Sequence, residues 1–488
     1  MTRMTVAGDP RTAEVSRCAT PGSDGGAAAA ALRSLLTVDD SAPRDVAGVT
    51  AEQLVALARR YGASPFTPLE EARRELRLDV DAFRRLLELF AGRPELRAAV
   101  VRGPAGKYWS NTVLPLERRG VLDAVLNGTP RHPHLLGLYP GPTCMFRCHF
   151  CVRVTGARYP QTALADGNAT LAAVIDEMPD DDPHALYLSG GLEPLTNPGL
   201  GGLVSRAARR GFELTLYTNS FALTEKTLSA QSGLWELGAV RTSLYGLSDE
   251  EYERTTGKRQ SYSRVRRNLL RFQQLRAERE APVRLGLNYI VLPGRAHRLL
   301  DLLDFVAELD AAAPGRPLDF LNLREDYSGR PDGALTPAER AELQSVLLAF
   351  EEKARQVAPR LRIDYGYALH ALKSGTEAEL VRIRPDTMRP SAHPQVAAQI
   401  DVLGDVYLYR EAGFPGLPGA DRYIAGRVDA DTSLRTVVDR FVTGRVRVPP
   451  SAGDEYFMDG FDQVVTARLN QLEADIAAGW SDHRGLLR

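Results

Sequence analysis

The fold is decided by the stretch Cys144-Met145-Phe146-Arg147-Cys148-His149-Phe150-Cys151, which holds three of the four cysteines in the 488-residue chain. Its C-x3-C-x2-C spacing gathers three thiols in one short loop. Soft thiolate ligands this close together favour iron–sulfur chemistry, and three of them bind three irons of a cubane [4Fe–4S] cluster. No cysteine follows Cys151, so the fourth iron is expected to stay open to a small chelating molecule.

Three other interpretations of the cysteines remain to be weighed against the cluster. A structural zinc site uses four ligands, usually as two separated pairs, and His149 is poorly placed because it directly follows Cys148. A disulfide framework is typical of short secreted chains that are rich in cysteine. Buried structural cysteines rarely cluster in this way. The spacing therefore favours the iron–sulfur cluster.

Composition limits the classes of partner. There are 61 Lys and Arg against 62 Asp and Glu, and the formal net charge is −1, so nothing predicts a nucleic-acid surface or a basic membrane-binding face. The N-terminus lacks the pattern of a signal peptide, and no apolar run is long enough to span a bilayer. Clustered free thiols then predict a reducing, cytoplasmic location. Residues 1–45, with Cys18, are rich in Ala, Gly and Asp and are expected to be a mobile arm.

The remaining chain divides into three parts by its patterns. Residues 46–130 are expected to form a helical N-terminal domain, with Thr67 capping one helix ahead of Pro68. Residues 131–335 alternate short apolar strands with helices, which predicts an α/β fold, a partial (β/α)6 barrel. Residues 336–488 form a C-terminal extension containing a β-hairpin. The strands are predicted at 135–139, 186–189, 214–218, 240–244, 285–291 and 319–323.

The cysteine loop follows the first predicted strand, and active sites in such barrels lie at the carboxyl ends of the strands. With aromatic Phe150 before its last cysteine, the loop resembles the signature of the radical S-adenosylmethionine (SAM) superfamily. The resemblance implies that the open iron holds the amino and carboxylate groups of SAM. One electron then splits SAM to a 5′-deoxyadenosyl radical. It further implies a set of SAM-binding residues: Phe150, Ser189, Gly190, Gly191, Glu193, Asn219 and Ser243.

Two of these segments depart from the superfamily pattern. Leu192 stands between the glycines and Glu193, and Ser220 replaces the glycine of a Thr-Asn-Gly segment. A tight turn at the glycines and ordinary strand-end caps at Asn219 and Ser243 are the alternatives to SAM binding. In the C-terminal extension, Tyr409 stands where relatives with auxiliary clusters place their first cysteine. The extension therefore resembles an auxiliary-cluster domain without its cysteines.

A closer resemblance covers the run from Gly137 to Tyr159 and further stretches as far as the C-terminal region. These residues resemble the radical-SAM ammonia-lyases of deoxyamino-sugar (desosamine) and macrolide biosynthesis. The resemblance implies a dTDP-4-amino-4,6-dideoxy-D-glucose substrate, hydrogen abstraction at C3, loss of ammonia and a dTDP-3-keto-4,6-dideoxy-D-glucose product. It also implies an external electron donor such as flavodoxin or ferredoxin.

Candidate substrate residues follow from their chemistry and placement. Glu325 and Asp326, at the end of the sixth predicted strand, are the expected acid–base catalysts, with a solvated charged loop as the alternative. Guanidinium groups suit phosphate and carboxylate. The expected substrate contacts are Arg153, Arg324, Tyr409 and Arg410.

Two other functions share part of these features. A radical-SAM dehydrogenase or epimerase acting on another sugar would carry the same motifs, and analysis of its products would separate it from a lyase. A non-enzymatic iron–sulfur sensor would need neither the glycine pair nor a SAM pocket. Cleavage of SAM by the reduced protein separates that class.

Overall fold

The computed structural model describes residues 45–46, 49–151, 154, 156–325, 335–375 and 380–481. Apart from Asp45, the predicted N-terminal arm lies outside this part of the chain. The same is true of Cys18, Arg153 and Asp326.

The six predicted strands form one curved parallel sheet. They are β3 (Leu135–Tyr139), β4 (Leu186–Leu188), β5 (Thr215–Thr218), β6 (Ala239–Leu244), β7 (Arg284–Val291) and β8 (Phe320–Glu325), paired in chain order. Alternate residues of β6 face opposite sides: Val240 and Leu244 are fully buried under the helices, whereas Arg241 and Ser243 line the inner side. The prediction of a partial (β/α)6 barrel is confirmed.

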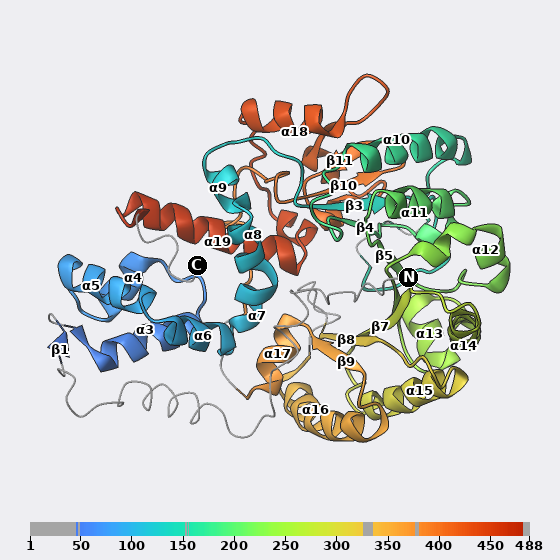
Figure 1. The fold of residues 1–488 in the computed structure, drawn as a ribbon, viewed down its shortest axis with the longest axis horizontal. Helices are drawn as coiled ribbons and strands as arrows, with labels where there is room; N and C mark the ends of the chain where they lie inside the picture. Colours follow the sequence, from blue (N-terminus) through green and yellow to red (C-terminus); the bar gives the residue numbers. More distant parts are fainter. Residues whose placement is uncertain are drawn as a thin grey trace, which may run out of the picture.

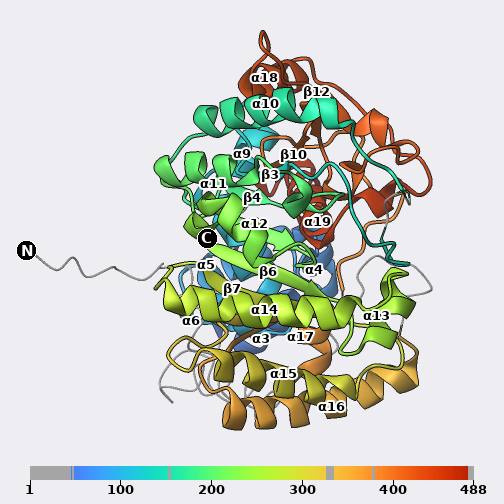
Figure 2. The same cartoon turned by 90° about the vertical axis from the view of Figure 1, so that its right-hand side faces the viewer.

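Helices cover the outer face of this sheet, as Figure 2 shows. The crossover between two parallel strands usually contains a helix, and the apolar side of that helix packs on the strands. They are α10 (Leu164–Glu177), α11 (Leu200–Arg209), α12 (Glu225–Ala230), α13 (Asp249–Thr256), α14 (Ser261–Glu278), α15 (Arg298–Ala312) and α16 (Pro337–Val357).

Both edges of the sheet are completed by strands that follow residue 335. At one edge β9 (Arg362–Tyr365) pairs parallel with β8, and at the other β10 (Ala397–Asp401) pairs parallel with β3. The antiparallel strands β11 (Asp405–Tyr407) and β12 (Ile424–Arg427) continue the sheet beyond β10. The predicted hairpin is thus β10–β11, and its turn needs Gly404, which has φ +81°. The sequence did not predict that this hairpin pairs with β3 and extends the barrel sheet.

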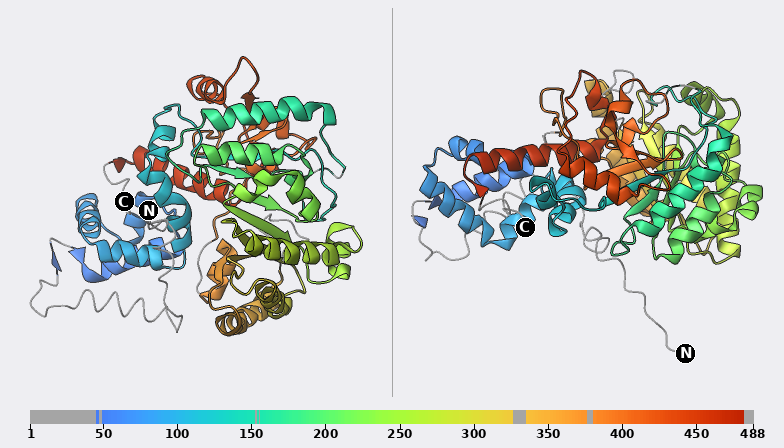
Figure 3. Two further views of the ribbon diagram at one scale, coloured as in Figure 1. Left: turned by 45° about the vertical axis from the view of Figure 1, so that its right-hand side comes forward. Right: turned by 90° about the horizontal axis from the view of Figure 1, so that it is seen from above.

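The N-terminal helices form a lobe beside the barrel (Figures 1 and 3). They are α3 (Ala51–Ala63), α4 (Leu69–Glu75), α5 (Val80–Ala91), α6 (Pro94–Arg102), α7 (Gly106–Tyr108), α8 (Leu114–Arg118) and α9 (Val121–Leu126), after the short strands β1 (Asp45–Val46) and β2 (Val49–Thr50). The C-terminal part adds α17 (Tyr367–Lys373), α18 (Leu434–Thr443) and α19 (Gly460–Ala477). No helix among the described residues is long and apolar enough to cross a membrane.

Helix α19 runs from the barrel across to this lobe, as the view from above in Figure 3 shows. Its Asp475 accepts a hydrogen bond from the Leu69 backbone N–H at 2.7 Å, at the start of α4. The prediction that Thr67 caps this helix is wrong, because the Thr67 hydroxyl donates to the Ser64 carbonyl oxygen instead. A carboxylate from the far end of the chain satisfies the N-terminus of α4.

We expect Asp475→Asn to stabilise the protein at neutral pH. Burial raises the pKa of Asp475 to about 6, above the value of about 3.9 for an unfolded chain. The folded state therefore favours the protonated acid, and the cost in stability grows as the pH rises from about 4 and is complete above about pH 6. The amide keeps the acceptor for Leu69 and removes that cost, which is at most about 3 kcal/mol.

Unfolding midpoints at pH 7 and pH 4 check this expectation. The gain should be present at pH 7 and vanish near pH 4, where the wild-type carboxyl is already neutral. Asp431→Asn, in an exposed turn, should change neither midpoint. A loss of stability at pH 7 in the Asp475 variant would contradict the assignment.

Candidate functional site

A cavity of about 450 Å³ lies at the carboxyl ends of the barrel strands. It gathers residues from the cysteine loop, from the ends of β4 to β8 and from the C-terminal extension. The predicted site residues that line it are Cys144, Cys148, Phe150, Cys151, Ser189, Gly190, Gly191, Glu193, Asn219, Ser243, Arg324 and Arg410. The structure thus brings most of the sequence-predicted residues to one place.

The cysteine loop is held in place by backbone hydrogen bonds. Arg147 N–H donates to the Thr256 carbonyl at 2.8 Å, and His149 N–H donates to the Thr255 carbonyl at 3.2 Å, at the end of α13. The three thiols form no disulfide and are half-buried. The Asn219 side-chain amide lies 3.8 Å from Cys144 Sγ, so it contributes a polar contact to one thiol.

The thiols fit an iron–sulfur cubane better than a single metal ion. Among the described residues, no three His, Cys, Asp or Glu side chains converge on one ion position. A cubane does not require such convergence, because each thiolate binds a different iron atom. Three soft thiols facing one cavity and held by a fixed loop are the donor set that a [4Fe–4S] cluster uses.

The glycine pair after β4 allows close backbone approach. Gly190 has φ +139°, and a Cβ there would lie 3.1 Å from Tyr139. A Cβ on Gly191 would lie 2.6 Å from the ring of Phe414, which comes from the C-terminal extension. Side chains at these positions would therefore push the loop away from its neighbours. Both glycines line the cavity, so their backbone faces it without an intervening side chain.

Glu193 is buried, and its carboxylate joins two strand ends. Its oxygens accept hydrogen bonds from Leu195 N–H at 3.1 Å, Thr218 Oγ1 at 2.5 Å and Asn219 N–H at 2.8 Å. Burial raises the pKa of Glu193, and these three donors oppose that rise. We infer that Glu193 positions Thr218 and Asn219 at the cavity wall.

The segment after β5 has a left-handed backbone at Ser220, the position where the superfamily pattern has glycine. Ser220 has φ +56° and is fully buried. Its hydroxyl lies 2.7 Å from the Thr242 hydroxyl of β6, which gives the serine a local hydrogen-bond partner in this left-handed conformation. The replacement of glycine by serine is thus accommodated, and Asn219 still faces the cavity.

Arginine side chains form the opposite wall. Arg324 donates to the Asn288 side-chain oxygen at 3.1 Å. Arg410 pairs with Asp459 at 2.7 Å and donates to the Tyr187 hydroxyl at 3.2 Å. This wall is cationic and carries phenol groups, which suits an anionic ligand that also has hydroxyl groups.

Sequence reasoning missed several lining residues, among them Tyr217, Arg241, Asn288 and Asp459. The alternation of inward and outward residues along β6 and β7 was a usable signal for Arg241 and Asn288. Asp459 caps α19, with Asp462 at the third helical position, so the D-x-x-D pattern was a signal for the helix start. Tyr217 lies on β5 just before Thr218, and its aromatic side chain gave no distinct signal.

Two predicted site residues do not line the cavity. Glu325 forms an ion pair with Arg340 of α16, so its carboxylate is directed toward that helix. Tyr409 is 5% exposed and packs against Tyr423 in an apolar cluster, with ring centroids 5.1 Å apart. The structure therefore does not support the expectation that these two side chains contact substrate. In both cases a tertiary partner turns the side chain away.

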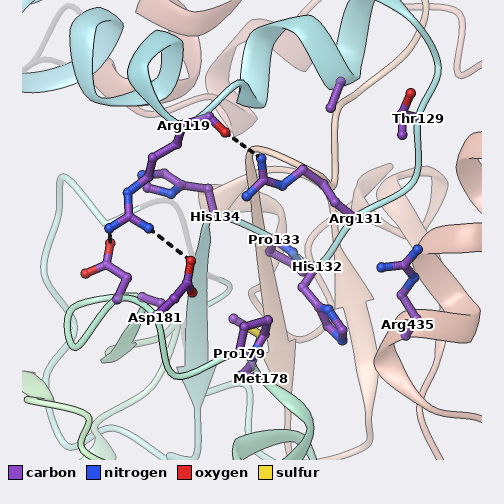
Figure 4. Close-up of a pocket in the computed structure, with 13 residues that line it drawn as sticks. Arg119, Thr129, Arg131, His132, Pro133, His134, Met178, Pro179, Asp181 and Arg435 are labelled. Atoms are coloured by element: carbon purple, nitrogen blue, oxygen red, sulfur yellow. Dashed lines mark hydrogen bonds and ion pairs between the residues drawn. The ribbon is translucent and has the colours of Figure 1, made fainter.

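A second hollow, of about 390 Å³, lies at the opposite end of the barrel before β3 and β4 (Figure 4). Arg119 pairs with Asp182 at 3.2 Å, and Arg131 donates to the Arg119 backbone carbonyl at 3.1 Å. None of Cys144, Cys148 and Cys151 lines this hollow. The cavity at the carboxyl ends is therefore the candidate active site.

Comparisons with known proteins agree with this geometry. The model of the radical SAM superfamily matches residues 138–306. The dTDP-4-amino-4,6-dideoxy-D-glucose ammonia-lyase of Streptomyces venezuelae is 65% identical over 485 residues, which cover 99% of this chain and 100% of that protein.

Likeness to solved structures is weak. The structure described as "Native anSMEcpe with bound AdoMet" has a TM-score of 0.42 and 13% identity, covering 72% of this chain and 100% of the other. The structure of Streptococcus suis SuiB bound to S-adenosylmethionine has a TM-score of 0.42 and 16% identity, covering 71% and 81% of the two chains.

The superfamily prediction made from the cysteine spacing is confirmed, and with it the [4Fe–4S] cluster and SAM as cofactors. The match with the S. venezuelae protein extends far beyond the barrel, into both the N-terminal lobe and the C-terminal extension. Identity at this level along nearly the whole chain shows that the protein belongs to the radical SAM superfamily, in the same family as the S. venezuelae ammonia-lyase.

Proposed function

We propose that this chain is a radical SAM ammonia-lyase that converts dTDP-4-amino-4,6-dideoxy-D-glucose to dTDP-3-keto-4,6-dideoxy-D-glucose. The reaction would serve deoxyamino-sugar (desosamine) formation in antibiotic biosynthesis. The full-length identity of 65% to the S. venezuelae enzyme carries the proposal. The single cavity that joins the cysteine loop to an arginine wall supports it.

One end of the cavity is assigned to the cofactors. Cys144, Cys148 and Cys151 would hold the cluster, and the open backbone at Gly190 and Gly191 would lie along SAM. The remaining SAM contacts are assigned to Phe150, Ser189, Glu193, Asn219 and Ser243. When bound, the cofactors supply abstraction of a hydrogen atom from carbon, which acid–base side chains cannot perform.

The other end is assigned to the nucleotide sugar. Arg324 donates to a neutral amide oxygen, so its charge remains available to an anion. Arg410 is held rigidly by Asp459 and Tyr187, which orients its guanidinium at the cavity wall. We assign these two arginines to the diphosphate, because a guanidinium fork matches phosphate oxygens. Arg153 also stays a proposed contact.

The residues around the cavity also shield the chemistry. Phe414, Tyr456 and Met458 of the C-terminal extension also line the cavity. Their apolar surface would exclude water from the reacting carbon atoms, which prevents side reactions of a radical. Two broader proposals go with the function: reduction by an external donor such as flavodoxin or ferredoxin, and a cytoplasmic location.

Isotope transfer tests the function. With substrate deuterated at C3, the reduced enzyme should place deuterium in 5′-deoxyadenosine and release ammonia together with the 3-keto sugar. The C3 hydrogen is transferred to the 5′-deoxyadenosyl group, and the C–N bond of the neighbouring carbon, C4, breaks. Deuterium transfer without ammonia would favour a dehydrogenase or an epimerase.

Two further results would point elsewhere. Cleavage of SAM with no deuterium transfer would mean that the substrate is another molecule. A reduced protein that never cleaves SAM would indicate an iron–sulfur sensor. Substrate deuterated at C5 is the matched control, and its label should stay in the sugar.

A further inference from the structure

Tyr217 lies in the cavity wall with its hydroxyl held by an arginine. It comes from β5 and lines the same cavity as Cys144 and Gly190. Arg241 Nη1 donates to Tyr217 Oη at 3.0 Å, and the Arg241 guanidinium carbon lies 4.8 Å from the centre of the tyrosine ring. Because a guanidinium group has no acceptor, the phenol oxygen must be the acceptor here. Its remaining lone pair is free for a second donor.

The charges around Tyr217 lower its pKa. The groups facing it are Arg241 from β6, Arg324 from β8, Arg410 after β11, Tyr187 from β4 and Asp459 at the start of α19. Burial by itself would raise the pKa of Tyr217, but the charges of Arg241, Arg410 and Arg324 together bring it below 10.

The neighbouring phenol behaves differently. Tyr187 packs edge-on against Tyr217 with ring centroids 5.8 Å apart, and burial keeps its pKa raised despite Arg410. The lowered pKa of Tyr217 therefore comes from its position among three guanidinium groups, because burial alone raises the pKa of a tyrosine.

Three carboxylates in or beside the cavity are already engaged by other groups, and a further one, Glu411, also lines it. Glu193 accepts three hydrogen bonds from Leu195, Thr218 and Asn219. Asp459 accepts from two backbone N–H groups of α19 and pairs with Arg410. Glu325, the base expected from the sequence, is bound to Arg340. The deamination nevertheless needs a group that accepts the proton of the C3 hydroxyl.

We propose that Tyr217 is the catalytic base that accepts this proton, and that Arg241 is the positioning residue that holds and activates it. The proposal rests on the proposed function. After hydrogen abstraction at C3, the O–H bond of the C3 hydroxyl breaks, its proton passes to the Tyr217 phenolate oxygen, and its electron pair stays on the sugar oxygen. The C4–N bond of the protonated amine then breaks, and nitrogen leaves as ammonia with the two electrons of that C4–N bond. A C3 carbonyl forms and the unpaired electron is left on C4, where one electron from the external donor and one proton complete the 3-keto sugar.

The Tyr217→Phe variant separates hydrogen abstraction from ammonia release. With C3-deuterated substrate it should still transfer deuterium to 5′-deoxyadenosine, because the cysteine loop is untouched. Ammonia formed per 5′-deoxyadenosine should fall by about 10²–10⁴-fold, the usual contribution of a positioned base. Tyr262→Phe, which removes a hydroxyl from α14 outside the cavity lining, is the matched control and should behave as wild type.

The pH dependence tests the role of Arg241. Ammonia release requires the phenolate, so it should reach a plateau above the Tyr217 pKa and be lost as the pH falls through that pKa. Arg241→Met removes one positive charge, so the pKa of Tyr217 should rise and the loss should begin at a higher pH. Ultraviolet difference titration of wild-type protein minus Tyr217→Phe protein follows the same phenol without turnover, and Arg241→Met should shift it in the same direction.

Several results would overturn the assignment. Wild-type ammonia yield in Tyr217→Phe would do so, as would a pH profile that Arg241→Met leaves unmoved. Loss of ammonia in Glu411→Gln or Glu325→Gln, with Tyr217→Phe unaffected, would place the base on a carboxylate. If the wild-type enzyme itself transferred deuterium but released no ammonia, the proposed function would fail instead, so the two failures are distinguishable.

Discussion

Cys148→Ala is expected to abolish cleavage of SAM and to lower the iron content of the protein. The wild-type chain should reconstitute anaerobically to about four irons, as one [4Fe–4S] cluster requires. Cys148 shares the cavity with Cys144 and Cys151, and its loss leaves two thiolates for a cluster that needs three. Iron and sulfide analysis, together with detection of 5′-deoxyadenosine, measures both effects.

Cys18→Ala supplies the matched control, since it removes the fourth cysteine of the chain and leaves the loop intact. Its iron content and SAM cleavage should equal those of wild type. About eight irons per wild-type chain, with matching sulfide, would mean that a second cluster exists. Undiminished SAM cleavage in Cys148→Ala would remove this residue from the ligand set.

Arg410→Ala is expected to impair use of the nucleotide sugar while leaving uncoupled SAM cleavage largely intact. Its guanidinium pairs with Asp459 at 2.7 Å and lies 4.9 Å from the centre of the Tyr187 ring. A hydrogen bond to a charged group contributes about 1.5–3 kcal/mol. Loss of such a contact to the diphosphate should therefore lower kcat/KM for the sugar by about 10–10²-fold. Steady-state kinetics with the sugar measure the loss of substrate use. Formation of 5′-deoxyadenosine without the sugar measures uncoupled SAM cleavage.

Two variants make this test specific. Arg410→Lys keeps the charge but loses the planar fork, so it should recover only part of the activity. Arg422→Ala breaks another arginine–aspartate pair of the C-terminal extension, with Asp454, outside the cavity lining. It should leave kcat/KM unchanged. If Arg410→Ala instead prevents reduction of the cluster, the substrate-binding role is wrong.

Much of the barrel follows from local sequence. The six central strands lie within one or two residues of their predicted positions, because a buried parallel strand requires a short apolar run between turn signals. The cysteine loop and the glycine pair were recognisable for the same reason. Their chemistry depends on spacing along the chain and on the absence of side chains, and both are visible in the sequence.

The tertiary structure decided which charged side chains reach the cavity. Arg410 enters because β10 pairs with β3, and the Tyr139 hydroxyl then donates to the Arg410 carbonyl across 271 residues of sequence. Glu325 is excluded by its partner on α16, and Arg241 gains a role only where β5 and β6 place it on Tyr217.

Patterns of period 2 or 3.6 fix which face of an element is buried, so the sequence determined the barrel, the cluster loop and the cofactor end. These periodic patterns carry no information on which distant element covers the buried face or which ion pair forms there. The arginine wall, the Tyr217–Arg241 pair and the closure by the C-terminal extension depend on such long-range packing. Only the folded chain, where burial and charge act together, decided them.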